Sequence, residues 1–150
     1  MEKVINNEQK YETYRMLMGR LKVAIDKEFW YEAIFLEYAM LEDRLHSVII
    51  HGGETINSRM IDNIKKIRKM VEKQRSGIGK YFDGEILNEV NDWRDKRNGL
   101  VHSLATKEYD NYQVKKVAQD GYDVIKRFSN KTTNYRRYLE RRAANGSLSR

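Results

Sequence analysis

Apolar residues recur at intervals of three and four along nearly the whole chain, which is the spacing of helices with one buried face. This pattern predicts helices over residues 7–27, 28–50, 59–75, 85–104 and 108–129. Paired glycines at Gly52 and Gly53 and a glycine-rich stretch at 75–84 interrupt it, so we expect connectors there. Proline is absent, and no stretch has the alternation that demands a strand. The sequence therefore predicts an all-α bundle of about five helices.

Two glycine features need separate interpretation. The stretch at 75–84 lacks the glycine spacing, the Ser or Thr after Lys80 and the preceding strand of a phosphate-binding loop, so we interpret it as a flexible connector. Gly121 lies in the middle of the apolar stripe of 108–129, where glycine is unfavourable for a helix. It is expected to let another helix approach closely.

Charged residues occupy two of the apolar stripes. Arg97 shares a helix face with Trp93 and Leu100, and a guanidinium is costly to bury without a partner, so we expect an anion beside it. Glu37 and Arg44 fall on the stripe of 28–50, where they can lie at its margin or pair with each other. The alternative is that Glu37 meets Arg97. Glu42 and Asp43 remain candidates for the same role.

A second face of the helix predicted at 85–104 carries polar groups at intervals of four: Arg94, Asn98 and His102. RNA supplies its own nucleophile, the 2′-OH, so a cleaving site needs a base with a pKa near neutrality and a cation for the phosphoryl oxygens. His102 suits the first role and Arg97 the second, while Asn98 can position either or donate to a phosphate oxygen. Arg94 is a supporting candidate. The alternative for His102 is a surface or capping histidine near a helix C-terminus.

The spacing Arg-Asn-x-x-x-His, which reads RNGLVH from Arg97 to His102, resembles the signature of the HEPN ribonucleases. The resemblance covers roughly residues 5–130. The family includes toxins of toxin–antitoxin pairs, abortive-infection proteins and nuclease domains of CRISPR-linked effectors. It implies metal-independent RNA cleavage at a cleft where two copies of the motif face each other, and an acidic residue on an early helix. It also implies an antitoxin or regulatory protein as a partner.

One position departs from a branch of that family. In the toxins paired with small nucleotidyltransferase antitoxins, a Tyr that the antitoxin modifies follows the His by two residues, and here that residue is Leu104. The resemblance therefore favours an unmodified toxin or another defence nuclease.

The spacing of Arg97 and His102 raises a geometric question. Five residues at about 100° each place them some 140° apart on a straight helix. They converge only if the helix deforms at Gly99 or if each site draws residues from two subunits. The sequence leaves both routes open.

Basic charge is uneven along the chain, whose net charge is +7. Residues 1–106 hold 18 Lys and Arg against 17 Asp and Glu, whereas residues 107–150 hold 11 against 5. Basic clusters on a balanced domain fit a polyanion such as RNA. The predicted RNA-binding residues are Lys65, Lys66, Lys69, Arg136, Arg137 and Arg141.

The C-terminal region is expected to lie outside the helical domain. We predict a HEPN-like domain over 1–130 and a basic, partly disordered extension over 131–150. Tyrosines interleaved with arginines over 135–142 can stack on bases while contacting phosphate. The alternative is a frayed terminal helix with a disordered tail.

The composition of the chain argues against metal-binding, membrane-spanning and secreted proteins. The chain has no Cys, no His-x-x-x-His pair and no apolar run of membrane-spanning length, and its N-terminus lacks the apolar core of a signal peptide. We therefore expect a cytoplasmic protein without metal or cofactor and without membrane contact. The sequence predicts a homodimeric endoribonuclease that acts in growth arrest or antiviral defence. The alternatives are a catalytically silent HEPN-like module that binds RNA or protein, and a structural helical subunit of a larger complex.

Overall fold

The computed structural model describes residues 7–106 and 110–148, and these residues form helices joined by short connectors. The elements are α1 (Asn7–Asp26), α2 (Trp30–His51), α3 (Met60–Glu72), the 3₁₀ helix η1 (Arg75–Lys80), α4 (Gly84–Ser103) and α5 (Asn111–Leu148). The predicted all-α bundle is confirmed, and the described residues include no strand. Among them, no helix is both long and apolar enough to cross a lipid bilayer.

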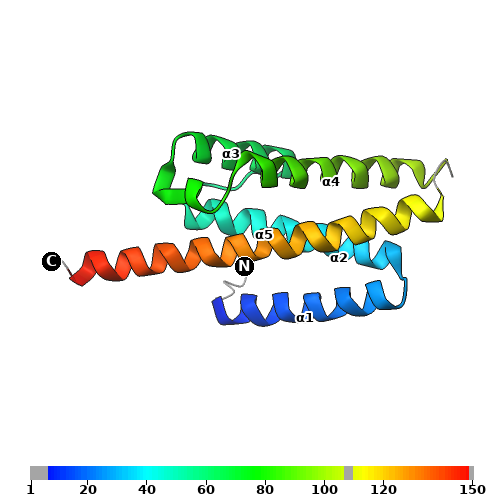
Figure 1. Ribbon diagram of the computed structural model, residues 1–150, viewed down its shortest axis with the longest axis horizontal. Coiled ribbons are helices and arrows are strands. Elements are labelled where there is room, and N and C mark those ends of the chain that lie inside the picture. The colour runs from blue at the N-terminus through cyan, green and yellow to red at the C-terminus, as the bar shows by residue number, and fades with distance from the viewer. Residues whose placement is uncertain (1–6, 107–109, 149–150) are drawn as a thin grey trace.

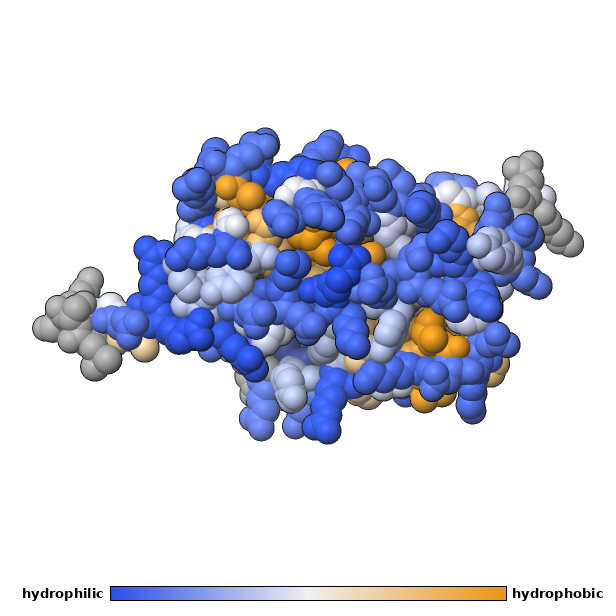
Figure 2. All heavy atoms as spheres, in the orientation of Figure 1, coloured by the Kyte–Doolittle hydropathy of each residue, from blue (hydrophilic) through white to orange (hydrophobic). Residues whose placement is uncertain are grey.

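Helices α2 and α5 form the centre of the bundle. Figure 1 shows α3 and α4 side by side along one flank and α1 along the other, with α5 running the length of the molecule. Helix α2 packs against α1, α3 and α5, and its buried side chains include Met40, Leu41, Leu45 and Val48. The face that carries α5 is mainly hydrophilic, with apolar side chains visible between the helices (Figure 2). The hydrophobic face of α2 is thus covered from several sides.

Close packing between α2, α4 and α5 depends on Gly121. A Cβ atom at this position would lie 2.4 Å from Glu37 Oε1 and 2.7 Å from Trp93 Nε1. Trp93 Nε1 also donates to the carbonyl oxygen of Val117, at 2.9 Å, which fixes the indole against α5. The predicted close approach at Gly121 is confirmed.

The end of α5 differs from the prediction. No break occurs at Ser129 or in the polar residues after it, because the hydroxyls there are satisfied within the fold. Thr132 Oγ1 donates to the Phe128 carbonyl oxygen of the preceding turn at 2.9 Å, and Tyr14 on α1 donates to Ser129. The predicted end at 129 is therefore wrong, and a domain boundary at residue 130 would cut through a continuous helix.

The residues beyond 130 contribute to the core. Tyr135 has no exposed surface, and its ring centroid lies 6.0 Å from that of Phe82 and 5.9 Å from that of Tyr81. Tyr138 packs on Tyr81 at 5.4 Å. Tyr135 is therefore not available to stack on an RNA base, because it is fully buried, and Tyr138 is partly buried against the segment before α4.

The connector between α3 and α4 forms helical turns with a kink at Ser76 and Gly77, whose φ values are +52° and +70°. Ile78 and Phe82 are buried in it. Gly77 has a φ of +70°, and a Cβ atom there would lie 2.7 Å from the Tyr138 ring. Glycine is required at this position both by its left-handed backbone and by the closeness of α5. The glycine-rich sequence thus supplies a packed reversal of the chain.

Candidate functional site

Helix α4 positions the RNGLVH motif. Asp83 Oδ1 accepts a hydrogen bond from the Ile86 amide at 2.9 Å and caps the N-terminus, as expected for an aspartate before the first turn. Ile86, Val90, Trp93 and Leu100 form the buried face. The helix continues through Gly99 to Ser103, so the predicted alternative of a deformed helix is not seen. Arg97 and His102 keep the separation of about 140° that a regular helix imposes.

Arg97 is partly buried against an aromatic ring on α2. Its guanidinium carbon lies 3.9 Å from the centroid of the Tyr38 ring, in cation–π contact. One terminal nitrogen donates to Asn98 Oδ1 at 3.1 Å, and the buried Nε has no hydrogen-bond partner. Among the residues that the structure describes, no carboxylate pairs with Arg97, and a ring face and a neutral amide hold the cation instead of the expected anion.

Glu37 lies next to Tyr38 in sequence but points into the contact between α2, α4 and α5. Its side chain has no exposed surface, and neither carboxyl oxygen has a hydrogen-bond partner. Burial, with a smaller contribution from the carboxylate of Asp120, raises the pKa of Glu37 to about 10. The carboxyl is therefore neutral at pH 7. The alternative in which Glu37 meets Arg97 is not seen, because the Glu37 carboxyl lies beside Gly121 and Trp93, whereas Arg97 lies over the Tyr38 ring.

The other candidate pairings of α2 also differ from the prediction. Arg44 pairs with Asp43 at 2.5 Å and lies 4.5 Å from the Tyr14 ring centroid, so it does not pair with Glu37. Asp43, which was also a candidate partner of Arg97, is thus paired with Arg44, and Glu42, the other candidate, is exposed. Two rings, those of Tyr38 and Tyr14, thus accommodate the two arginines that the apolar stripes carry.

Arg94 and His102 are not brought into contact with Arg97. Arg94 donates to Asn91 Oδ1 at 3.2 Å and pairs with Asp95 at 2.7 Å, both on its own helix. His102 is exposed in the last turn of α4. Within the described residues, the motif residues that meet are Arg97 and Asn98.

Exposed apolar side chains flank the contact between Arg97 and Tyr38. Phe35 lies one turn before Tyr38 on α2 and is 71% exposed, and Val101 lies one turn after Arg97 on α4 and is 41% exposed. Leu104 adds to the same end of α4. Tyr38 was not predicted from the sequence, because a half-buried ring on the edge of a stripe looks like an ordinary core residue. The surface beside Arg97 is therefore apolar and open.

The predicted RNA-binding residues lie on two separate helices. Lys65 and Lys69 are exposed on α3, while the Lys66 ammonium donates to the Thr55 carbonyl oxygen. Arg136 and Arg137 lie on α5 and line a cavity between α1, α2 and α5, and Arg141 is exposed beyond it. The structure therefore does not assemble these six residues around His102.

In the part of the chain that the structure describes, no three His, Asp or Glu side chains are close enough to hold a metal ion. Comparison of the chain with protein-family models, with curated proteins and with solved structures found no match.

Proposed function

We propose that the chain is a metal-independent endoribonuclease of the HEPN type, active as a homodimer in growth arrest or antiviral defence. Arg97, Asn98 and His102 carry the reaction. RNA is the substrate, and an antitoxin or another regulatory protein controls the activity. The proposal rests on the resemblance of the RNGLVH motif and on the way the fold presents Arg97.

The observation that carries the proposal is a cation that is anchored but not neutralised. Tyr38 and Asn98 hold the guanidinium of Arg97, and no carboxylate among the described residues pairs with it. A purely structural buried arginine normally has an anionic partner. An arginine fixed by a ring and an amide keeps its charge available for a phosphoryl oxygen.

A second copy of the chain brings an arginine and a histidine close together, which a single chain does not do. A regular helix keeps Arg97 and His102 about 140° apart, so one chain does not aim both at the same phosphate. Exposed Phe35, Val101 and Leu104 lie beside the site and offer an apolar surface for self-association. In a two-fold dimer the same patch is used by both subunits, so Arg97 of one copy faces His102 of the other.

The reaction then follows from these groups. His102 removes the proton from the 2′-OH, whose oxygen attacks the adjacent phosphorus, while Arg97 stabilises the charge that develops on the phosphoryl oxygens. The bond to the 5′ oxygen of the next nucleotide breaks, that oxygen takes a proton from water, and His102 returns its proton to the solvent. The products are a 2′,3′-cyclic phosphate and a 5′-OH. An RNA with a 2′-deoxy sugar at the scissile position should therefore resist cleavage.

RNA cleavage in the presence of EDTA is the experiment that tests this function. The parent chain should cut RNA, and Arg97→Ala and His102→Ala should each lower the rate by about 10²–10⁴-fold without loss of helicity, as expected for loss of a charge stabiliser or a general base. Arg15→Ala is a matched control, because Arg15 is exposed on α1 and takes no part in the proposed site. Retention of RNA without cleavage would favour the silent binding module, and neither binding nor cleavage would favour a structural subunit.

The dimer is tested by mixing the two inactive variants. If each site combines Arg97 of one copy with His102 of the other, a heterodimer of Arg97→Ala and His102→Ala contains one intact site and cuts at about half the parent rate per dimer. If both residues act within one chain, each subunit of the heterodimer is damaged and cleavage stays lost. An inactive heterodimer would thus contradict the shared site while leaving the cleavage function itself standing.

A further inference from the structure

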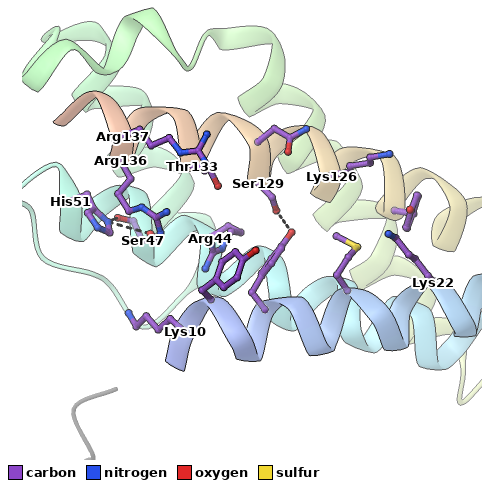
Figure 3. A pocket seen from close by; sticks show the side chains of 15 residues that line it. Lys10, Lys22, Arg44, Ser47, His51, Lys126, Ser129, Thr133, Arg136 and Arg137 are labelled. Atoms are coloured by element: carbon purple, nitrogen blue, oxygen red, sulfur yellow. Dashed lines mark hydrogen bonds between the residues drawn. The ribbon is translucent and has the colours of Figure 1, made fainter. Parts of the chain in front are cut away.

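A cavity of about 300 Å³ lies between α1, α2 and α5 and is lined by basic side chains. Lys10 and Lys22 come from α1, Arg44 from α2, and Lys126, Arg136 and Arg137 from α5 (Figure 3). No Asp or Glu is among the residues that line it. Its size is that of a small ligand-binding pocket, about 300–1,000 Å³. The fold thus gathers cations that are far apart in sequence around one space.

Most of this positive charge is not neutralised. Arg44 pairs with Asp43, and Arg136 lies 3.6 Å from the carboxylate of Glu140. The other four lining cations form no ion pair with any residue that the structure describes: Lys10, Lys22, Lys126 and Arg137. Cations that line a shared cavity repel one another unless an anion occupies it. The cavity therefore has a strong electrostatic preference for an anionic ligand.

Hydroxyl groups and rings complete the lining. Tyr14 donates to Ser129 across the space between α1 and α5 (Figure 3), and Thr133 lies one turn after Ser129. His51 Nδ1 lies 2.7 Å from the Ser47 carbonyl oxygen, within hydrogen-bond distance. The exposed ring of Tyr11 lies at the same cavity. Lys and Arg can bind phosphate oxygens, hydroxyls can add hydrogen bonds, and a tyrosine face can stack on a base.

From this lining we propose that the cavity is a binding site for a phosphorylated ligand of nucleotide size. It is separate from the Arg97 site, because Arg44, Ser47 and His51 follow Tyr38 by six, nine and thirteen residues. On a helix those offsets place them about 180–240° around the axis, on the opposite side of α2. The proposal also gives Arg136 and Arg137 a role different from the RNA-binding extension predicted from the sequence. Ligand binding can consequently be measured without reference to cleavage.

Calorimetric titration of the full chain with ATP in EDTA, with adenosine as the uncharged control, tests the proposal. ATP should bind, adenosine should not, and the double variant Lys126→Gln with Arg137→Gln should bind ATP at least about tenfold more weakly, as expected for loss of charge-assisted hydrogen bonds. Both side chains are exposed, so the variant should fold as the parent does. The control Arg15→Gln with Lys73→Gln removes the same charge from exposed positions outside the cavity and should bind like the parent.

Three results would overturn the proposal. They are absence of ATP binding, equal binding of adenosine, and an affinity that falls equally in both double variants, which would make the attraction one of net charge only. Competition between ATP and short RNAs then separates two sources of the phosphate. Displacement by a 5′-phosphorylated RNA but not by its 5′-hydroxyl counterpart assigns the site to an RNA end, and displacement by neither assigns it to a free nucleotide. Equal displacement of ATP by both RNAs would mean that the cavity does not recognise a terminal phosphate.

Discussion

Replacement of Glu37 by Gln should change how the stability of the protein depends on pH. The carboxyl of Glu37 is fully buried without a hydrogen-bond partner, and its pKa is raised from 4.5 to about 10. Between these two values the folded chain keeps this proton while the unfolded chain loses it. The stability of the parent is therefore fully present below about pH 4.5 and falls as pH rises toward the folded pKa of about 10.

The size of the effect follows from proton linkage. One proton of difference changes the free energy of unfolding by about 1.4 kcal/mol per pH unit. Gln has nearly the same shape and does not ionise, so it removes this slope while keeping a buried polar group. The free energy of unfolding of Glu37→Gln, relative to that of the parent, should therefore rise by about 2.7 kcal/mol between pH 6 and pH 8. The difference in the free energy of unfolding between Glu37→Gln and the parent at a single pH does not test the prediction, because the buried amide of Gln has its own desolvation cost. The change of that difference with pH tests it.

Urea denaturation at pH 6, 7 and 8, followed by far-UV circular dichroism, measures this difference. Glu42→Gln is the matched control, because it makes the same chemical change at an exposed position of α2. Its stability curve should run parallel to that of the parent. If the curve of Glu37→Gln is also parallel to the parent, Glu37 is ionised in the folded protein and the reasoning from burial is refuted.

Three further changes test the packing and the proposed site. Gly121→Ala should lower the free energy of unfolding by about 1–3 kcal/mol in a urea titration, because the added methyl group would press on the Trp93 ring. An unchanged denaturation midpoint would mean that α2 and α5 can separate to make room. Tyr38→Leu should slow RNA cleavage by up to about tenfold while Tyr38→Phe keeps the parent rate, since the ring face holds Arg97; equal rates for both would remove Tyr38 from the site. A chain that ends at residue 134 should lose about 3–5 kcal/mol of stability, because it lacks the buried Tyr135 ring. A chain that ends at residue 142 keeps this ring and should melt at the same temperature as the parent. Equal melting temperatures of the two truncated chains would contradict a structural role for Tyr135.

Periodicity predicted the helices best where one face is continuously apolar. The stripe of 28–50 corresponds to α2 at Trp30–His51, and that of 85–104 corresponds to α4 at Gly84–Ser103. Gly121 was also predictable, because glycine in the middle of an apolar stripe has few explanations other than close packing. The polar run at 129–134 misled the prediction, since Ser and Thr favour turns only when the helix and its neighbours leave their hydroxyls unsatisfied.

The candidate site was predictable in its residues but not in its contacts. The motif from Arg97 to His102 is visible in the sequence, and the position of Arg97 on an apolar stripe indicated that it needs a partner, although the expected anion is not among the described residues. The identity of that partner depends on which ring of α2 faces α4, and periodicity alone does not give the rotation of one helix against another. The neutral state of Glu37 was equally hidden, because it arises from desolvation by three helices at once.

The long α5 helix has a consequence for how the chain is made. It is the last helix of the described chain, yet it covers α2 and contacts α1 and α4. The hydrogen bond from Tyr14 to Ser129 joins residues that are 115 positions apart in the sequence. Until α5 has been synthesised, the helices that precede it have only an incomplete apolar centre, and such nascent chains are prone to aggregation. Folding of the bundle therefore requires α5, and a product that stops before Tyr135 lacks the ring that packs against Phe82.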